Sequence, residues 1–240
     1  MRSDRVVIPP ARGHSSQVEV TRTIGTDIIV GRYPEGASLP RDAELTTMFN
    51  VSRTVLRESV KTLSAKGLLN SKAGVGTRVR ERSAWNMFDS DVLGWHLEAG
   101  IDKRFLRDLA DIRLAVEPHA AALAAERRAD EAIAILRDSI AKMRSYASDS
   151  IEFADADLQL HLDIATISAN PFMRSIGAVI EAALRASFRL SAPTEELERE
   201  LTIDAHERIV DAIAEGNAEA AAAAMKEVIF NGLRRHGAAG

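Results

Sequence analysis

The sequence has no cysteine, only two tryptophans, and no apolar run long enough to cross a bilayer. The lack of cysteine excludes disulfides and thiolate metal sites and fits a reducing compartment. The first residues show no apolar core followed by a small-residue cleavage site, so a secretory signal is not expected. We therefore expect a cytoplasmic protein with no membrane partner.

Charge is distributed unevenly along the 240 residues. The first 80 residues hold 13 Lys and Arg against 7 Asp and Glu, a net charge of +6. The remaining residues hold 18 against 28, a net charge of −10. This length suits a small domain and a larger one, and the asymmetry predicts a polyanionic partner for the first domain only. Chance clustering of surface charge is the alternative.

Residues 34–79 predict a helix, a tight turn, a second helix and a short hairpin. Ser52 is suited to cap the second helix, which has an apolar stripe at helical spacing. The side away from this stripe carries Arg53, Thr54, Arg57 and Lys61. A helix of this kind can reach phosphates and base edges in the major groove of DNA.

Two short strands, at 68–71 and 77–80, are expected to form a wing beside this helix. Lys72, Gly74 and Gly76 lie in or next to its turn, where a DNA backbone could pass. Residues 1–15 have no periodicity and are predicted to be a disordered tail. A first helix is expected over 16–30, and residues 81–90 are interpreted as a linker.

The region 16–80 resembles the winged helix-turn-helix domain of the GntR family of bacterial transcription regulators. The resemblance rests on Pro34-x-Gly36, Leu39-Pro40, Glu44-Leu45, Val51-Ser52-Arg53-Thr54, Arg57-Glu58, Gly67-Leu68 and Gly74-x-Gly76-Thr77-x-Val79. It implies that Ser52, Arg53, Thr54, Arg57, Lys61, Lys72, Gly74 and Gly76 face double-stranded DNA. Ala43 departs from the pattern, because several FadR-type members have a DNA-contacting Arg there.

Residues 91–236 read as consecutive helices, which predicts an all-α antiparallel bundle. Asp157 and His161 lie four residues apart on one helix, and His206 lies on a later one. Carboxylate and imidazole groups that converge from different helices can bind a divalent cation. A surface or helix-stabilising contact between Asp157 and His161 is the alternative.

The second domain resembles the FCD domain, the helical effector domain of FadR-group regulators. The resemblance rests on Arg113-x-x-x-Glu117-Pro118, Asp157-x-x-x-His161, Asn170-Pro171, and His206 followed by Gly216-Asn217. It implies a zinc or nickel ion held by an Asp and three His, and a carboxylate effector. Asp157, His161 and His206 match three ligands, but Val228 stands at the fourth position, so an ion-free polar pocket stays open as the rival.

A bound carboxylate would need a cationic partner, and Arg113 is the first candidate because guanidinium groups bind carboxylates through two hydrogen bonds. An ion pair with Glu117 is its alternative. Arg185 and Asn170 are further candidates, with a surface role and a turn role as alternatives. The segment Trp85-Asn86-x-x-Asp89-x-Asp91-Val92-Leu93-x-Trp95 resembles FCD regulators of sugar-acid catabolism, which implies a sugar-acid effector.

Taken together, these features predict a homodimeric repressor that binds a near-palindromic operator and responds to a sugar acid. A regulator that responds to another organic acid or to an acyl-CoA is the first alternative. A metal-dependent hydrolase is the second, and it would need a general base beside an open coordination position. No such constellation or nucleophile motif accompanies Asp157 and His161, so no enzymatic activity is expected.

Overall fold

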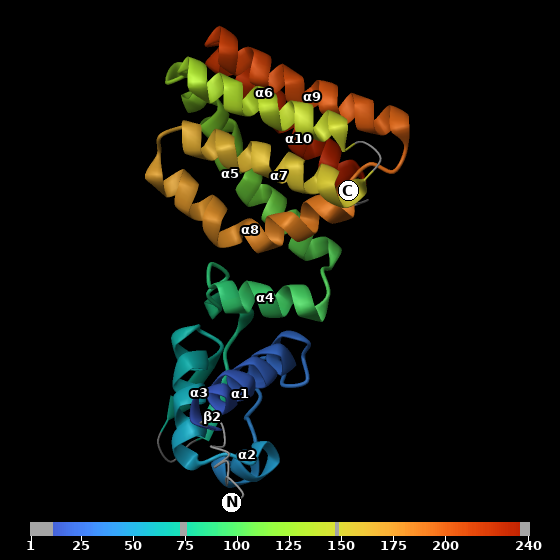
Figure 1. The fold of residues 1–240 in the computed structure, drawn as a ribbon. Helices are drawn as coiled ribbons and strands as arrows, with labels where there is room; N and C mark the ends of the chain where they lie inside the picture. Colours follow the sequence, from blue (N-terminus) through green and yellow to red (C-terminus); the bar gives the residue numbers. More distant parts are fainter. Residues whose placement is uncertain (1–11, 73–75, 147–148, 236–240) are drawn as a thin grey trace, which may run out of the picture. The chain divides into compact units, whose positions relative to one another are not determined.

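The computed structural model describes residues 12–72, 76–146 and 149–235. Over this part the chain is mainly helical, and it divides into two compact units, residues 1–99 and 100–240 (Figure 1). The first unit has a winged helix-turn-helix and the second is all-helical. The predicted fold class is therefore confirmed. No helix of the described residues is long and apolar enough to cross a membrane.

The described residues of the first unit form three helices, a two-stranded sheet, a short 3-10 helix and a fourth helix. In chain order these are α1 (Arg12–Ile29), α2 (Asp42–Phe49), α3 (Arg53–Ala65), β1 (Leu69–Lys72), β2 (Gly76–Val79), η1 (Arg82–Ala84) and α4 (Ser90–Ala99). The strands are antiparallel, with Leu69 opposite Val79. Helix α1 begins at residue 12, before the predicted start at 16. Residues 1–11 of the predicted tail lie outside the described part of the chain.

The turn between α2 and α3 follows from its local sequence. Asn50 ends α2 in the left-handed conformation, with φ of 49°, which asparagine adopts more readily than most residues. Ser52 then caps α3, because its hydroxyl accepts a hydrogen bond from the amide of Val55 at 3.3 Å. Leu56 and Leu63 are fully buried against the core of this unit. The remaining face of α3 is free to meet a partner.

Helix α4 packs with the winged helix, although the sequence placed its residues in the second domain. Trp95 lies over Gly25 of α1 so closely that a Cβ at Gly25 would come within 2.5 Å of the indole. Lys66, which caps α3, binds both carboxylate oxygens of Asp89 at 2.8 Å. The division into units falls after Ala99, followed by Gly100 at φ of 100°.

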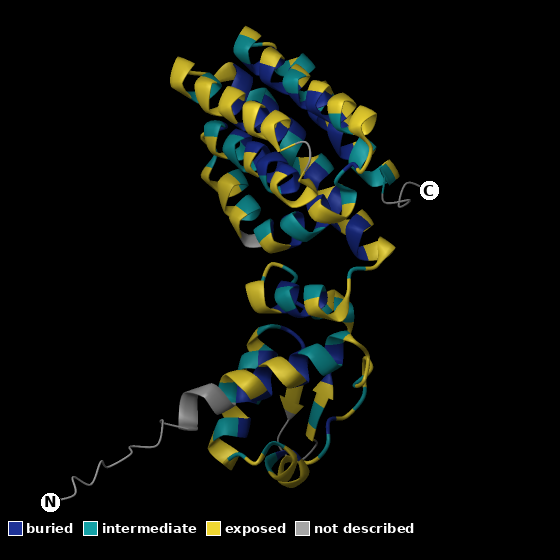
Figure 2. Cartoon of the chain, turned by 45° about the vertical axis from the view of Figure 1, so that its right-hand side comes forward, coloured by how far each residue is buried: buried dark blue, intermediate teal, exposed yellow. Residues whose placement is uncertain are grey.

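Within its described residues, 100–146 and 149–235, the second unit is a bundle of six helices. They are α5 (Lys103–Glu126), α6 (Asp130–Ser145), α7 (Ser150–Ile167), α8 (Pro171–Ser191), α9 (Glu196–Glu215) and α10 (Ala218–Arg235). Helix α10 packs on α5 and α9, while α7 packs between α6 and α8. Buried residues, dark blue in Figure 2, lie on the sides of the helices that face one another. Small alanines of α5, such as Ala121 and Ala124, are fully buried and allow close helix contact.

Candidate functional site

The candidate nucleic-acid interface is the outer face of α3. Arg53, Thr54, Arg57 and Lys61 are exposed there, as the sequence predicts. Between α3 and the two strands lies a cavity of about 690 Å³, and Arg57, Lys61 and Arg80 contribute cationic groups to its wall. Lys61 is paired with Glu58 at 2.7 Å, but both side chains are exposed, so the pair constrains the lysine little.

The wing is described only in part. Lys72 ends β1, and its side chain lies outside the described residues, as does Gly74. Gly76 begins β2 with φ of 99°, a conformation that favours glycine. Ala43 is exposed on the first turn of α2, where a methyl group offers DNA no hydrogen bond.

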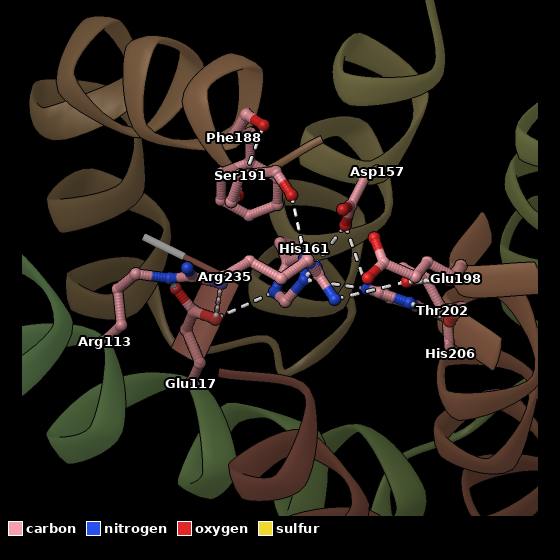
Figure 3. Close-up of polar contacts among 10 residues, drawn as sticks. All are labelled: Arg113, Glu117, Asp157, His161, Phe188, Ser191, Glu198, Thr202, His206 and Arg235. Carbon is pink, nitrogen blue, oxygen red and sulfur yellow. Dashed lines mark hydrogen bonds and ion pairs between the residues drawn. The ribbon is translucent and has the colours of Figure 1, made fainter. Parts of the chain in front are cut away.

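Asp157 and His161 of α7 meet His206 of α9 inside the second unit (Figure 3). Asp157 Oδ1 lies 2.9 Å from His206 Nε2 and 3.3 Å from His161 Nε2. The two Nε2 atoms are 3.3 Å apart. All three residues are buried, so the contact between Asp157 and His161 within α7 is not at the surface.

The outer nitrogens of both imidazoles are occupied. His161 Nδ1 lies 2.8 Å from Glu117 Oε2, and His206 Nδ1 lies 2.7 Å from the carbonyl oxygen of Thr202. A carbonyl or carboxylate oxygen only accepts, so each Nδ1 carries the proton and, in a neutral ring, each Nε2 carries a lone pair. Among the described residues, the buried Asp157 Oδ1 has no hydrogen bond of good geometry. Three atoms that can each accept thus face one another, and either a proton on one Nε2 or a bound cation relieves their mutual repulsion.

A divalent cation fits this set of donors. An ion roughly 2.1 Å from each donor would separate neighbouring donors by about 3.0 Å in octahedral and about 3.4 Å in tetrahedral geometry. The observed separations of 2.9, 3.3 and 3.3 Å match that range. Two imidazoles and one carboxylate suit zinc or another first-row divalent ion.

The electrostatics of the cluster also favour a positive charge. Burial raises the pKa of Asp157, but His206 and His161 outweigh that effect and hold it well below its ordinary range. Burial lowers the pKa of His161, but the neighbouring Glu117 and Asp157 outweigh it and raise the pKa overall. Burial also raises the pKa of Glu117, while Arg113 and His161 lower it to about 2. Both carboxylates are therefore ionised at neutral pH.

Arg113 forms the ion pair with Glu117 that the sequence analysis gave as the alternative to carboxylate binding. Its Nε and Nη2 donate to the two oxygens of Glu117 at 2.8 and 3.2 Å, and its guanidinium lies 4.5 Å from the ring centroid of Phe188. The adjoining cavity is only about 30 Å³ and mostly apolar. Arg113 therefore supports Glu117, which in turn orients His161.

Arg185 and Asn170 lie outside this set of contacts. Arg185 pairs with Glu181 and Asp155, each at 3.0 Å, with its side chain 39% exposed. Asn170 caps α8, because its Oδ1 accepts from the amide of Phe172 at 3.0 Å. These positions correspond to the surface role and the turn role that were their alternatives.

Arg235 joins the site, although the sequence reasoning did not select it. Its Nε donates to the carbonyl oxygen of Ser191 at 2.8 Å, and its Nη1 to Thr202 Oγ1 at 3.3 Å (Figure 3). Arg235, His206 and Val228 line a cavity of about 350 Å³ between α9 and α10. Burial lowers the pKa of Arg235, and Asp157 opposes this shift. Arg235 follows Val228 by seven residues, or about two helical turns, so the sequence alone could have placed it on the same face of α10.

This fold defines a class of protein, a DNA-binding regulator with a second, all-helical domain. The pattern of the gntR family of bacterial regulatory proteins matches residues 16–79, and that of the FCD domain matches residues 108–231. The chain belongs to the GntR family, in the group that carries an FCD domain.

Similar proteins agree with this assignment. The galactonate operon transcriptional repressor of Escherichia coli K12 is 32% identical over 213 residues, which cover 89% of this chain and 93% of that protein. The uncharacterized HTH-type transcriptional regulator YieP of E. coli K12 is 32% identical over 204 residues, 84% of this chain and 87% of that protein. The structure of a Streptococcus agalactiae GntR protein has a TM-score of 0.50 at 26% identity and covers 91% of this chain and 99% of its own. The two Escherichia coli relatives are named as transcription regulators, the class that the sequence predicts for this chain.

Proposed function

We propose that this regulator is a homodimeric repressor of a sugar-acid catabolic operon, controlled by a sugar acid bound in the FCD domain. The proposal of a bound effector rests mainly on the buried triad of Asp157, His161 and His206. Three acceptor atoms of this triad converge beside an arginine-lined cavity. The galactonate operon repressor, which covers most of the chain, supports a hydroxylated carboxylate as the effector class.

The first unit supplies operator binding. Ser52 holds the start of α3, so that Arg53 and Arg57 are presented to guanine edges or phosphates and Thr54 to the backbone or a thymine methyl. Lys61 and Gly76 would meet the phosphate backbone, and the sequence predicts the same role for Lys72 and Gly74. Two copies related by a two-fold axis would bind a near-palindromic operator.

The second unit supplies the response. Asp157, His161 and His206 would hold a zinc or nickel ion, which supplies a Lewis-acid contact for an anion when bound. Arg235 would bind the effector carboxylate from α10, the task first expected of Arg113. The wall of the 350 Å³ cavity also contains Asn231, Glu198 and Thr202, which can hydrogen-bond to hydroxyl groups. An acyl-CoA would need an extensive apolar lining, and this polar wall does not favour one.

The effector controls DNA binding only through its different affinities for two arrangements of the protein. If it binds the arrangement that does not fit the operator more tightly by about 1.4 kcal/mol, operator binding weakens tenfold. For a repressor of a catabolic operon this direction gives induction by the substrate of the operon.

A thermal-shift titration of zinc-loaded protein with D-galactonate, D-gluconate and octanoyl-CoA tests the proposal. The sugar acids should raise the melting temperature, because a ligand that binds only the folded state stabilises it. Arg235→Met should lose most of this shift, while the matched variant Arg185→Met, at an exposed ion pair, should keep it. An equal shift in Arg235→Met and the parent would exclude Arg235 as the carboxylate partner, and no shift with any sugar acid would refute the effector class.

A further inference from the structure

The chain ahead of the winged helix carries cationic residues that the proposed operator contacts do not use. Residues 1–12 contain Arg2, Arg5 and Arg12 against one acidic residue, Asp4, and they contain no lysine. The pattern of the gntR family begins at residue 16, so this segment is not part of what defines the family. Residues 1–11 precede the described part of the chain, and they join the first unit where α1 begins, at Arg12.

The start of α1 lies toward the first turn of α3. In the middle of α3, Oγ of Ser59 lies 3.3 Å from the carbonyl oxygen of Gln17. Further along α1, Gly25 packs against Trp95, whose ring centroid lies 6.0 Å from Nζ of Lys66 at the end of α3. Helices α1 and α3 therefore run in the same general direction. The part of α1 before Gln17 points toward the end of α3 that enters the major groove in helix-turn-helix complexes.

The lengths of the two helices place the start of α1 near DNA bound to α3. From Gln17 back to Arg12, α1 rises about 7.5 Å, and from Ser59 back to Arg53, α3 rises about 9 Å. Arg12 is therefore roughly level with the first turn of α3. The residues before Arg12 would span up to about 36 Å when fully extended, which compares with about 34 Å for one turn of DNA. Such a reach extends beyond the half-site that α3 reads.

We propose that residues 1–12 form a cationic arm that binds the DNA beside the half-site, with Arg2 and Arg5 in the adjacent minor groove. Arginine suits this task, because a narrow minor groove has an enhanced negative potential that attracts inserted arginines. Pro9-Pro10 disfavours a helical conformation, so the sequence is compatible with an extended arm. The inference rests on the proposed operator binding by α3 and adds a contact outside the bases that α3 reads.

The test compares two duplexes that contain the same selected operator. One duplex ends at the operator, and the other continues for about one further helical turn on each side. Gel-shift titrations at several salt concentrations measure three full-length proteins: the parent, the double variant Arg2→Gln/Arg5→Gln, and a control. The control, Arg104→Gln/Arg107→Gln, removes the same charge from the exposed surface of α5.

The arm variant should lose affinity only where flanking DNA is present. On the flanked duplex, Arg2→Gln/Arg5→Gln should bind about tenfold more weakly at low salt, and its salt slope should fall by about 1.8, because each neutralised phosphate contributes about 0.9. On the trimmed duplex it should match the parent, and the control should match the parent on both. The advantage of the flanked duplex should be greater with A·T-rich than with G·C-rich flanks, and equal advantages would exclude the minor groove.

Three results would contradict the inference, and they are distinguishable. Equal binding of the parent and Arg2→Gln/Arg5→Gln to the flanked duplex would overturn the arm and leave operator binding by α3 standing. An equal loss of affinity on both duplexes would also overturn it, because the arginines would then act on the operator itself, on folding or on a second copy of the chain. A parent that does not prefer the trimmed operator to a scrambled duplex of the same length would refute operator reading by α3 together with the inference.

Discussion

Glu117 is the residue on which the geometry of the candidate site depends most. Its carboxylate accepts two hydrogen bonds from Arg113 and one from His161 Nδ1, at 2.8, 3.2 and 2.8 Å. Glu117→Gln keeps the shape of the side chain but removes the negative charge. The change leaves the guanidinium of Arg113, which is 10% exposed, without a counter-ion. It also replaces one of the two acceptor oxygens with a donor NH2 group, so the side chain can no longer accept from both Arg113 and His161 as the carboxylate does.

The expected loss of stability is large. Removing one partner of a buried ion pair costs about 3–5 kcal/mol, because the other charge stays buried. The pKa of Glu117, lowered from 4.5 to about 2, gives a similar order of magnitude, about 3 kcal/mol at about 1.4 kcal/mol per pKa unit. Zinc affinity should also fall by about 10- to 100-fold, which is typical when a group that orients a metal ligand is removed.

The chain offers a matched control for this variant. Glu181 and Arg185 form a second pair four residues apart on one helix, but their side chains are 43% and 39% exposed. Glu181→Gln should therefore cost about 1 kcal/mol or less and leave zinc binding unchanged. The two variants differ chiefly in burial and in contact with His161.

Urea denaturation followed by far-ultraviolet circular dichroism measures the effect. Trp85 and Trp95 both lie in the first unit, so tryptophan fluorescence reports on that unit and separates it from the bundle. We expect Glu117→Gln to lower the urea midpoint of the second unit, which circular dichroism detects. The fluorescence-detected midpoint of the first unit should stay unchanged. If Glu117→Gln and Glu181→Gln lower the midpoint equally, the buried Arg113–Glu117–His161 chain is not what stabilises the site.

Two other predictions test the first unit. Gly25→Ala forces the indole of Trp95 aside, and this overpacking should lower the free energy of unfolding by about 1–3 kcal/mol. The loss should exceed the roughly 1 kcal/mol that alanine adds over glycine in a helix, so the variant should be less stable. Gly94→Ala, in open space on α4, should instead stabilise by up to about 1 kcal/mol, and fluorescence-detected unfolding compares the two; equal effects would refute the packing of α4 on α1. Arg53→Ala should weaken binding to a selected operator at least tenfold with unchanged circular dichroism, and unchanged affinity in a gel-shift titration would exclude α3 as the reading helix.

Much of the fold followed from local rules. The cap at Ser52, the stripe that buries Leu56 and Leu63, and the turn after α2 depend on neighbouring residues, so the sequence predicts them directly. The sequence does not predict the position of α4 in this way, because that position depends on a contact between Trp95 and Gly25, which are 70 residues apart. A tryptophan in the sequence indicates that it will be buried but not against which helix.

The sequence predicts the three candidate metal ligands well, but it predicts the partners of the arginines less well. Asp157 and His161 share a helix face by spacing alone, His206 is a candidate on a later helix, and the resemblance to the FCD domain matches all three to metal ligands. Arg113 has Glu117 four residues later, and only the fold decides whether that pair or an anion takes the guanidinium. Arg235 depends on contacts with Ser191 and Thr202, which lie 44 and 33 residues away in the chain.

The central claim is that a sugar acid bound at the Asp157–His161–His206 site controls operator binding. The most direct measurement is the affinity of the zinc-loaded protein for a selected operator, titrated with D-galactonate, before and after removal of zinc by a chelator. We expect galactonate to weaken operator binding at least tenfold in the loaded protein, and to have little effect after chelation or in Asp157→Asn. An equal response in all three samples, or none in the loaded parent, would contradict the claim.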